Sequence, residues 1–444
     1  MRQARLSAVL GVLIGATVIL TACRDSGTGT VTDADHSLRV QTVNPIEGKF
    51  GTEITVSGAG FGNQISDIDL TINGKEAEIL SSTTQTITAV VPEAAKSGPV
   101  IVTVNGQTTQ GPIFNYIPTI KVTTLAGSGL LGLRDGKGVN AQFNFPVGLD
   151  LMENGDLVVV DYWNHSIRIV TPDGTVSTLA GNGEPGSRDG VGADARFFRP
   201  IDVEVTDDGS FLVSDFGNHR IRQITPSGRV TTFSGTVVGY QNGPPYSAQF
   251  SYPAGIAQAD DDTLFVSDSG NNRVRWVAPN GDVGTFAGSG AHGFENGYGE
   301  LAEFSFPFGL DLGTNNRIFI ADYGNNSIRL ISSEHVVSTL TGSRETDSFN
   351  AEGTDARFNA PYDVVVDDNN NIIYVADYKN NRIRRISPQR EVTNIAGDGT
   401  AGFTDGDETQ ARFNRPIGLA INDDGTVLYV ADHFNHAIRK IKIE

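Results

Sequence analysis

The stretch DYWNHSIR, residues Asp161 to Arg168, decides the fold because the chain repeats it. Close copies are DFGNHRIR, DSGNNRVR, DYGNNSIR, DYKNNRIR and DHFNHAIR, which begin at Asp215, Asp268, Asp322, Asp377 and Asp432. The steps between these aspartates are 54, 53, 54, 55 and 55 residues. A nearly constant period of this length is typical of solenoids and propellers. Residue types that occur in all six copies are therefore predicted to be scaffold.

Each repeat contains four short runs with the composition of β-strands, which we name strands a, b, c and d. In the first repeat they are VGLDLM, DLVVVD, SIRIVT and VSTLAG. A proline precedes every strand a, at Pro146, Pro200, Pro253, Pro307, Pro361 and Pro416. Four-stranded sheets repeated around an axis leave few exposed sheet edges. The sequence therefore predicts an all-β chain with a six-bladed β-propeller.

The two ends of the repeat region complement each other. The region opens with a lone d-like run, VTTLAG at 122–127, and the last repeat stops after strand c at AIRKIKIE. Each end supplies what the other lacks. We therefore expect Val122 to Ala126 to form the outer strand of the last blade, because an unlatched ring would keep two open edges.

Two stretches, FNRPIGLAINDDGTVLYVADHFNHAIRKI and YPAGIAQADDDTLFVSDSGNNRVRWV, resemble NHL repeats. The resemblance implies an NHL-type propeller over residues 119–444. It does not imply one activity, because similar propellers include protein-binding and RNA-binding modules, amidating lyases and gluconolactonase-like hydrolases.

Residues 38–118 show short alternating runs separated by turn signals, such as EITVSG, IDLTING and GPVIVTVNG. The stretches NPIEGKFGTEITVSGAGFG and INGKEAEILSSTTQTITAVVP resemble the IPT/TIG domain, which is immunoglobulin-like. The resemblance implies a β-sandwich that serves as a spacer or binding module and carries no catalytic centre.

The N-terminus has the pattern of a targeting signal. Arg2 and Arg5 precede an apolar run that is too short to span a bilayer as a helix, so residues 1–22 are expected to be removed. The sequence LTAC before residue 24 resembles the lipobox of bacterial lipoproteins, which implies that Cys23 is lipidated. Residues 23–37 are then a flexible tether. Arg24 favours the outer membrane, facing either the periplasm or the outside, and the lipid is the predicted membrane contact.

The formal net charge of −19 argues against nucleic acid as a partner, because phosphate binding needs a basic surface. Cys23 is the only cysteine, which excludes an intramolecular disulfide.

Deviations among the repeats suggest a binding sector. Two large apolar rings occur two residues after the repeat aspartate, where three repeats have glycine, and histidines occur nearby. These residues belong to repeats six, one and two, which are neighbours in a closed ring. Aromatic rings and imidazoles in turns can bind a glycan or a protein partner, although drift at exposed turns would give the same pattern. The predicted ligand-binding residues are Trp163, His165, His219, His433, Phe434 and His436.

Strand a places carboxylates in the central channel. The residue three positions after each proline is aliphatic and should pack between blades, so the alternate positions should face the channel. Crowded carboxylates can be relieved by Ca²⁺ or Mg²⁺, but solvated acids need no metal. The residues predicted to line the channel and to ligate such an ion are Asp150, Asp202, Glu204, Asp311 and Asp363.

These features favour a lipid-anchored cell-envelope protein whose propeller binds a glycan or protein. The alternative is a metal-dependent hydrolase or lyase with its site in the acidic channel. No nucleophile beside a base is evident, and strand a carries no histidine for zinc, so no catalytic residue is assigned.

Overall fold

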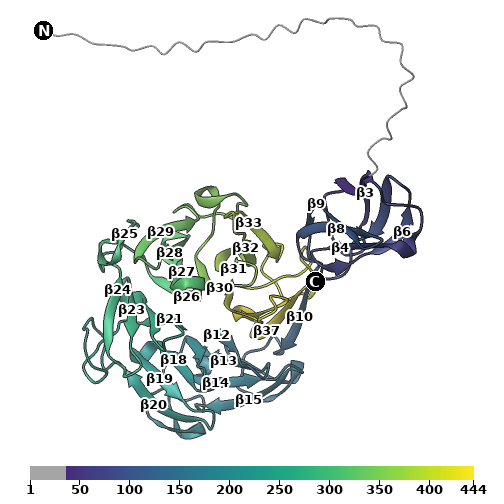
Figure 1. Ribbon diagram of the computed structural model, residues 1–444. Helices are drawn as coiled ribbons and strands as arrows, with labels where there is room; N and C mark the ends of the chain where they lie inside the picture. Colours follow the sequence, from purple (N-terminus) through teal and green to yellow (C-terminus); the bar gives the residue numbers. More distant parts are fainter. Residues whose placement is uncertain (1–36) are drawn as a thin grey trace, which may run out of the picture. The chain divides into compact units, whose positions relative to one another are not determined.

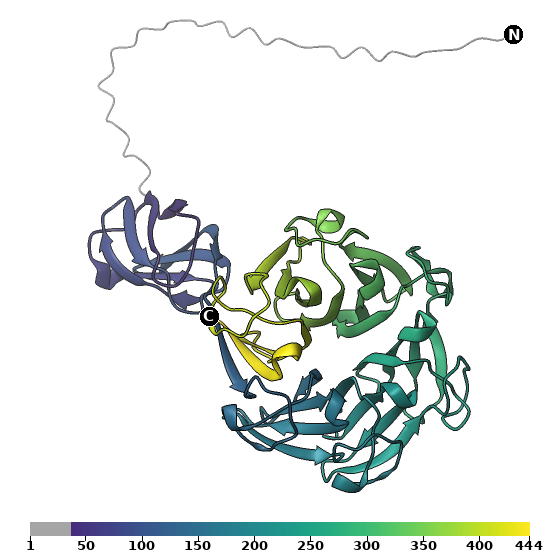
Figure 2. The ribbon, with the colours of Figure 1, turned by 180° about the vertical axis from the view of Figure 1, so that it is seen from behind.

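The computed structural model describes residues 37–444, which are all-β and contain no α-helix. The predicted signal (1–22) and Cys23 lie outside the described residues. The described chain divides into a smaller sandwich and a larger ring of sheets, each of which is drawn in Figures 1 and 2.

The sandwich consists of two sheets. One has the order β1-β3-β7-β6 and contains β1 (Arg39–Asn44), β3 (Glu53–Ala59), β7 (Thr86–Val90) and β6 (Glu78–Ser82). The other has the order β2-β9-β8-β4-β5 and contains β2 (Glu47–Gly48), β9 (Gln107–Tyr116), β8 (Gly98–Val104), β4 (Ile68–Ile72) and β5 (Lys75–Glu76). Alternate residues of β8 are buried, as expected for a strand with one face against a core.

The ring consists of six antiparallel blades, and strand a of each blade is at one edge of its sheet. Blade one contains β12 (Pro146–Leu151), β13 (Leu157–Asp161), β14 (Ser166–Val170) and β15 (Thr175–Ala180). Blade two contains β17 (Asp202–Val205), β18 (Phe211–Asp215), β19 (Arg220–Ile224) and β20 (Arg229–Ser234). Blade three contains β21 (Pro253–Gln258), β22 (Leu264–Asp268), β23 (Arg273–Val277) and β24 (Val283–Ala287). Blade four contains β26 (Pro307–Gly313), β27 (Arg317–Asp322), β28 (Ser327–Ile331) and β29 (Val336–Thr341). Blade five contains β30 (Pro361–Asp367), β31 (Ile372–Asp377), β32 (Arg382–Ile386) and β33 (Val392–Ala396).

Blade six closes the ring in the predicted way. It contains β35 (Pro416–Ile421), β36 (Val427–Asp432) and β37 (Ala437–Ile443), and its fourth strand is β10 (Ile120–Ala126). β10 pairs antiparallel with β37, and Val122 lies opposite Ile441. Figures 1 and 2 both show this blue strand beside the yellow C-terminal strand. The prediction of a six-bladed propeller closed by an N-terminal outer strand is confirmed.

The segments between strands d and a carry small additions to the outer edges of the blades. Four two-residue strands pair with strand d, namely β11 (Gly136–Lys137), β16 (Gly190–Val191), β25 (Gly297–Tyr298) and β34 (Gly406–Asp407). In every repeat, a single 3₁₀ turn joins strand b to strand c. These turns are η3 (Tyr162–Asn164), η5 (Phe216–Asn218), η6 (Ser269–Asn271), η9 (Tyr323–Asn325), η11 (Tyr378–Asn380) and η12 (His433–Asn435).

The repeated Asp and Arg form a buried ion pair in every blade. Arg168 Nη1 lies 2.7 Å from Asp161 Oδ2, and neither side chain is exposed. The other five pairs are equally buried, with distances of 2.6 to 2.9 Å. Arg168 also binds Asp135 in the d–a loop at 2.7 Å, so it fastens that loop to the blade. The sequence DYWNHSIR is therefore mainly scaffold.

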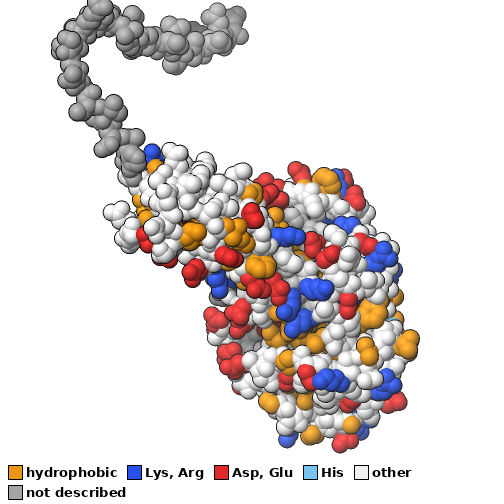
Figure 3. Space-filling model, turned by 90° about the vertical axis from the view of Figure 1, so that its right-hand side faces the viewer, with side chains coloured by type: hydrophobic (Ala, Val, Ile, Leu, Met, Phe, Trp, Pro, Cys, Tyr) orange, Lys and Arg blue, Asp and Glu red, His pale blue; other side chains and the backbone are white. Residues whose placement is uncertain are grey.

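The b–c turns and the d–a loops share one face of the ring, which we call the turn face. In blade one, the backbone N–H of Trp163 donates to Asn144 O, and Asn164 Nδ2 donates to Gly132 O. Acidic and basic side chains are interspersed on the side of the molecule shown in Figure 3. Among residues 37–444, no helix has the length and apolar character needed to cross a bilayer.

Candidate functional site

The residue that follows each b–c turn links its blade to the next blade. This residue has a left-handed backbone, with φ between 48° and 58°, which Asn tolerates well and His tolerates better than most residues. Three repeats have His here and three have Asn. In each, a side-chain atom accepts a hydrogen bond from the backbone N–H of the residue before the next blade's proline. The acceptors are His165, His219, Asn272, Asn326, Asn381 and His436, and the donors are Arg199, Tyr252, Phe306, Ala360, Arg415 and Phe145.

This contact gives three of the predicted ligand-binding residues a structural role. Nδ1 of His165, His219 and His436 accepts the inter-blade bond at 3.0 to 3.1 Å, as the Asn Oδ1 does in the other blades. Burial lowers the pKa of each imidazole and so favours the neutral ring, and the inter-blade bond selects the tautomer in which Nδ1 carries no proton. Ligand binding by these histidines stays a prediction. Their hydrogen bonds to the next blade favour a structural role.

Trp163 and Phe434 are exposed on the turn face, and each lies beneath an arginine. The Cζ atom of Arg199 lies 4.3 Å from the Trp163 ring centroid, and the Cζ atom of Arg415 lies 4.6 Å from that of Phe434. These distances are typical of cation–π contacts. Phe145 meets Phe434 edge-on, with centroids 5.1 Å apart. The two rings predicted from the sequence are therefore part of a larger group of aromatic and cationic side chains.

His433 lies inside this group. Its ring centroid is 5.0 Å from that of Phe145, and its Nδ1 is 3.0 Å from Pro146 O. Burial lowers its pKa to about 4, so it is neutral at physiological pH. His433 therefore contributes a neutral, mostly packed ring to the surface.

Sequence reasoning missed Phe145, Arg199 and Arg415, which all stand immediately before a proline. They come from d–a loops that connect blades six to one, one to two and five to six. The available signal was that this position varies among the repeats as Phe, Arg, Tyr, Phe, Ala and Arg.

A cluster of tyrosines was also missed. Tyr362 follows the proline of blade five and stacks on Phe308, with centroids 4.5 Å apart. Tyr323 and Tyr378 follow the repeat aspartates of blades four and five, and lie 5.9 and 5.7 Å from Tyr362. Burial raises the pKa of Tyr362 well above its usual value, and the nearby Tyr162, Tyr378 and Tyr323 raise it further. The Tyr362 phenol therefore stays protonated and can donate a hydrogen bond.

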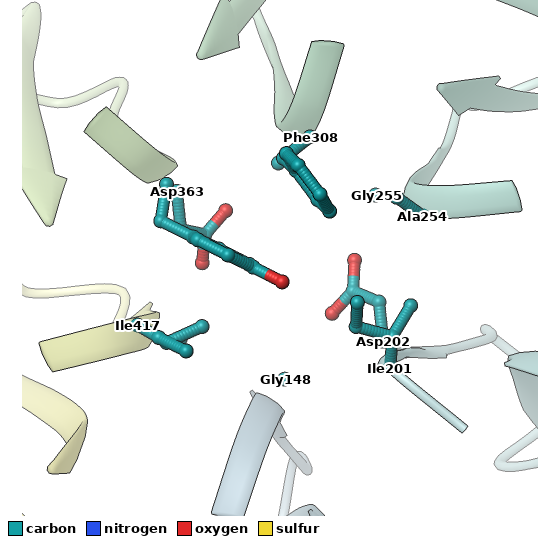
Figure 4. Close-up of a pocket in the computed structure, with 11 residues that line it drawn as sticks. Gly148, Ile201, Asp202, Ala254, Gly255, Phe308, Asp363 and Ile417 are labelled. Atoms are coloured by element: carbon teal, nitrogen blue, oxygen red, sulfur yellow. The ribbon is translucent and has the colours of Figure 1, made fainter. Parts of the chain in front are cut away.

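The first residues of strand a surround a narrow pore below this cluster. Figure 4 shows Asp202, Phe308 and Ile417 directed into the space between the blades. The pore has a volume of about 20 Å³, enough for roughly one water molecule. The blades approach closely here, because a Cβ on Gly148 would lie 2.2 Å from Asp202 Oδ1. A Cβ on Gly309 would lie 2.0 Å from Asp363 Oδ1, so glycine is required beside each of these acids.

The five predicted carboxylates surround a deeper cavity of about 210 Å³, which we call the acidic cavity. The structure therefore brings Asp150, Asp202, Glu204, Asp311 and Asp363 together in the channel. Each accepts a hydrogen bond from strand a of the next blade. The donors, in the same order, are the backbone N–H groups of Val205, Ile256, Gln258, Val366 and Leu419, at 2.7 to 3.0 Å.

Burial raises the pKa of all five carboxyls, and the backbone hydrogen bonds oppose the rise. The pKa reaches about 6 for Asp150, about 7 for Asp363 and about 8 for Asp311. The pKa values of Asp202 and Glu204 lie well above their usual range, because neighbouring carboxylates add to the effect of burial. The cavity therefore holds protons at neutral pH.

The arrangement does not favour a divalent cation. Both oxygens of Asp150, Asp311 and Asp363 already accept backbone N–H groups. Within the described part of the chain, no three His, Cys, Asp or Glu side chains form a group that could hold a metal ion. The carboxylates act instead as links between neighbouring blades, a role that strand parity alone did not indicate. The Ca²⁺ or Mg²⁺ site stays a prediction without support from this geometry.

Comparisons with known proteins find similarity in both parts of the chain. An IPT/TIG domain model matches residues 38–116, and an NHL repeat model matches 143–170, 197–224, 250–277 and 358–386. The chain is 29% identical over 330 residues to NHL repeat-containing protein 2 of Homo sapiens, covering 65% of this chain and 45% of that protein. It is 28% identical over 341 residues to Protein SUPPRESSOR OF QUENCHING 1, chloroplastic, of Arabidopsis thaliana, covering 72% and 27%. The chain thus spans less than half the length of these relatives.

Two solved structures are similar in fold over most of the chain. A structural genomics protein from Bacteroides thetaiotaomicron aligns with a TM-score of 0.62 and 19% identity, covering 91% of this chain and 98% of that one. An auxiliary nutrient binding protein from the same species aligns with a TM-score of 0.57 and 20% identity, covering 92% and 99%. At these identities the likeness shows the fold alone.

Proposed function

We propose, from the premise that this chain joins an IPT/TIG domain to an NHL-repeat propeller, that it is a binding protein of the cell envelope. The propeller recognises a glycan or protein partner on its turn face. The chain is anchored through a lipid on Cys23, and the outer membrane is its location. The name of one fold neighbour, auxiliary nutrient binding protein, is in keeping with a binding role.

One observation carries the proposal, namely the group of aromatic and cationic side chains in blades six, one and two. Trp163 and Phe434 are 42% and 36% exposed, although aromatic rings of this size are usually packed away. Each is held in place by an arginine that comes from a neighbouring loop. Trp and Arg are enriched among residues that dominate binding energy, and a rigid ring loses little entropy when a ligand binds.

The test is a double substitution, Trp163→Ala with Phe434→Ala, in the full chain purified in detergent. The wild type is screened against a glycan array and used to capture partners from the envelope of the source cell. We expect the double variant to bind the captured ligand at least tenfold more weakly than the wild type, with an unchanged melting temperature. Leu301→Ala is the matched control, because Leu301 is an exposed apolar residue of another blade's d–a loop. Equal binding by wild type and double variant would refute the proposed surface.

A further inference from the structure

The turn-face opening of the channel, which we call the mouth, has an unusual charge. Four repeat positions surround it, namely the residues just before and after each proline and the two residues after each repeat aspartate. None of these positions is Asp or Glu in any of the six repeats, in a chain that contains 52 acidic residues. Three of them are cationic, Arg199, Lys379 and Arg415. These four positions therefore carry only positive formal charge, while Asp202 and Asp363 line the pore below them.

The cations of the mouth have no carboxylate partner. Some surface arginines in the described chain do have such a partner, for example Arg273 with Glu300 and Arg412 with Asp398, whereas others, such as the exposed Arg229, do not. Among residues 37–444, no ion pair within 4.0 Å involves Arg199, Lys379 or Arg415. The Nε atom of Arg199 is also buried without a hydrogen-bond partner. Each cation lies instead over an aromatic ring.

Tyrosine side chains lie beside both arginines of the mouth. Burial raises the pKa of Tyr162, and the charge and hydrogen bond of Arg199 oppose that rise, so this guanidinium lies beside the Tyr162 hydroxyl. Tyr162 in turn raises the pKa of Tyr362, and Tyr378 and Tyr323 raise it as well. On the far side, the Cζ atom of Arg415 lies 5.6 Å from the Tyr378 ring centroid. Guanidinium groups therefore bracket a group of phenols.

We infer that the mouth binds acidic oligosaccharides, meaning sugars that carry carboxylate groups. The inference rests on the proposed function and names its ligand class. A guanidinium fork matches a carboxylate in shape and charge, and the four positions around the mouth carry no acidic side chain that would repel it, although Asp202 and Asp363 line the pore below. Phenol hydroxyls both donate and accept hydrogen bonds, as sugar hydroxyls require. The pore is too small to admit a protein side chain, which favours a ligand that lies across the mouth.

The experiment compares ligands that differ only in charge. Binding of oligogalacturonate, hyaluronan oligosaccharides and oligoalginate to the full chain is measured by calorimetry, with methyl-esterified oligogalacturonate as the neutral match. We expect at least one acidic oligosaccharide to bind, at least tenfold more tightly than its neutral form where that form is tested. Raising the salt concentration should weaken this binding.

Substitutions assign the binding to the mouth. Arg199→Gln and Arg415→Gln should each weaken binding of the acidic sugar at least tenfold, and Arg199→Lys should restore part of it. Arg229→Gln is the control, because Arg229 is exposed beside a c–d turn, at the other end of the blade from the mouth. Melting temperatures show whether each variant is folded.

Three outcomes would overturn the inference. Equal affinity for acidic and esterified sugars would remove the role of charge and leave the proposed function standing. Binding of poly-glutamate with no acidic sugar bound would make the ligand a protein, again within the proposed function. If no acidic sugar binds and the Trp163 and Phe434 double variant also retains all captured partners, both the inference and the proposed function fail.

Discussion

The Nδ1 atom of His436 accepts a hydrogen bond from the backbone N–H of Phe145 over 3.1 Å, and this bond joins the last blade to the first. His or Asn makes the same bond at each of the five remaining junctions between blades. It acts beside the pairing of β10 with β37, which closes blade six internally. Closure of the ring is therefore secured twice, once within a blade and once between blades.

The first prediction concerns this junction. His436→Ala should lower the free energy of unfolding by about 1 to 3 kcal/mol, because the Phe145 N–H loses its acceptor in a partly buried position. His436→Asn should retain most of the stability, since Asn fills this position in three blades. Urea denaturation followed by circular dichroism measures both variants. Equal stability of the Ala variant and wild type would show that the bond is dispensable.

The second prediction concerns the buried ion pairs. Asp268→Ala should lower the free energy of unfolding by about 3 to 5 kcal/mol, because Arg275 would remain buried without its counter-ion. Asp173→Ala removes an exposed ion pair with Lys137 and should change the free energy of unfolding far less, because solvent screens exposed charges. Denaturation curves of the two variants test the difference. A smaller loss for Asp268→Ala than for Asp173→Ala would contradict a scaffold role.

The third prediction concerns the closing strand β10. Val122 is fully buried in the last blade, whereas Thr123 faces solvent. Val122→Asp should therefore cost several kcal/mol, since it places a charge in an apolar core. Thr123→Asp should change stability by only about 0.5 kcal/mol. Thermal melts of the full chain compare the two, and equal melting temperatures would mean that β10 does not hold the ring closed.

The fourth prediction is a loss of stability with rising pH through the acidic cavity. The pKa of Asp311 is raised to about 8 in the folded protein from an ordinary value of 3.8. The folded state then holds a proton that the unfolded chain has released, so this group's contribution to stability falls as pH rises toward 8. The histidines have the opposite effect below about pH 6.5, where stability rises with pH. Burial lowers their pKa values, so the unfolded chain binds protons there that the folded protein does not.

The informative window is therefore pH 6.5 to 8. Over this range, Asp311→Asn should flatten the decline in the free energy of unfolding, by at most about 1.4 kcal/mol per pH unit. Asp173→Asn is the control, since Asp173 is exposed outside the cavity. Urea denaturation at three pH values gives the slopes. A slope for Asp311→Asn equal to that of wild type would show that the cavity does not hold this proton.

The fifth prediction concerns the lipid. Wild-type protein expressed in a bacterial host should incorporate labelled palmitate and sediment with the membrane fraction. Cys23→Ser should abolish the label and release the protein, because no other cysteine is present to accept a lipid. Ser26→Ala should behave as wild type. Labelling of the Cys23→Ser variant would refute the lipobox prediction.

Much of the candidate site could be predicted from the sequence. The exposed rings of Trp163 and Phe434 and the five channel carboxylates were identifiable because strand parity and position in a repeat are local properties. His165, His219 and His436 were identifiable as deviations, but their role was not, because Asn and His can perform the same hydrogen bonding in a turn. Arg199, Arg415 and the tyrosines were missed because each gains its significance from a neighbouring blade.

The sequence by itself determined the number of blades, the phase of the closing strand and the scaffold role of the repeated Asp and Arg. These follow from periodicity and from the parity of side chains along a strand, which need no knowledge of distant contacts. Only the tertiary structure decided what the channel acids and the turn histidines bind, and which cations lie over which rings. Those contacts join residues of different blades or loops, for example 34 or 55 apart along the chain and 291 apart at the ring closure, so they depend on how closely neighbouring blades approach.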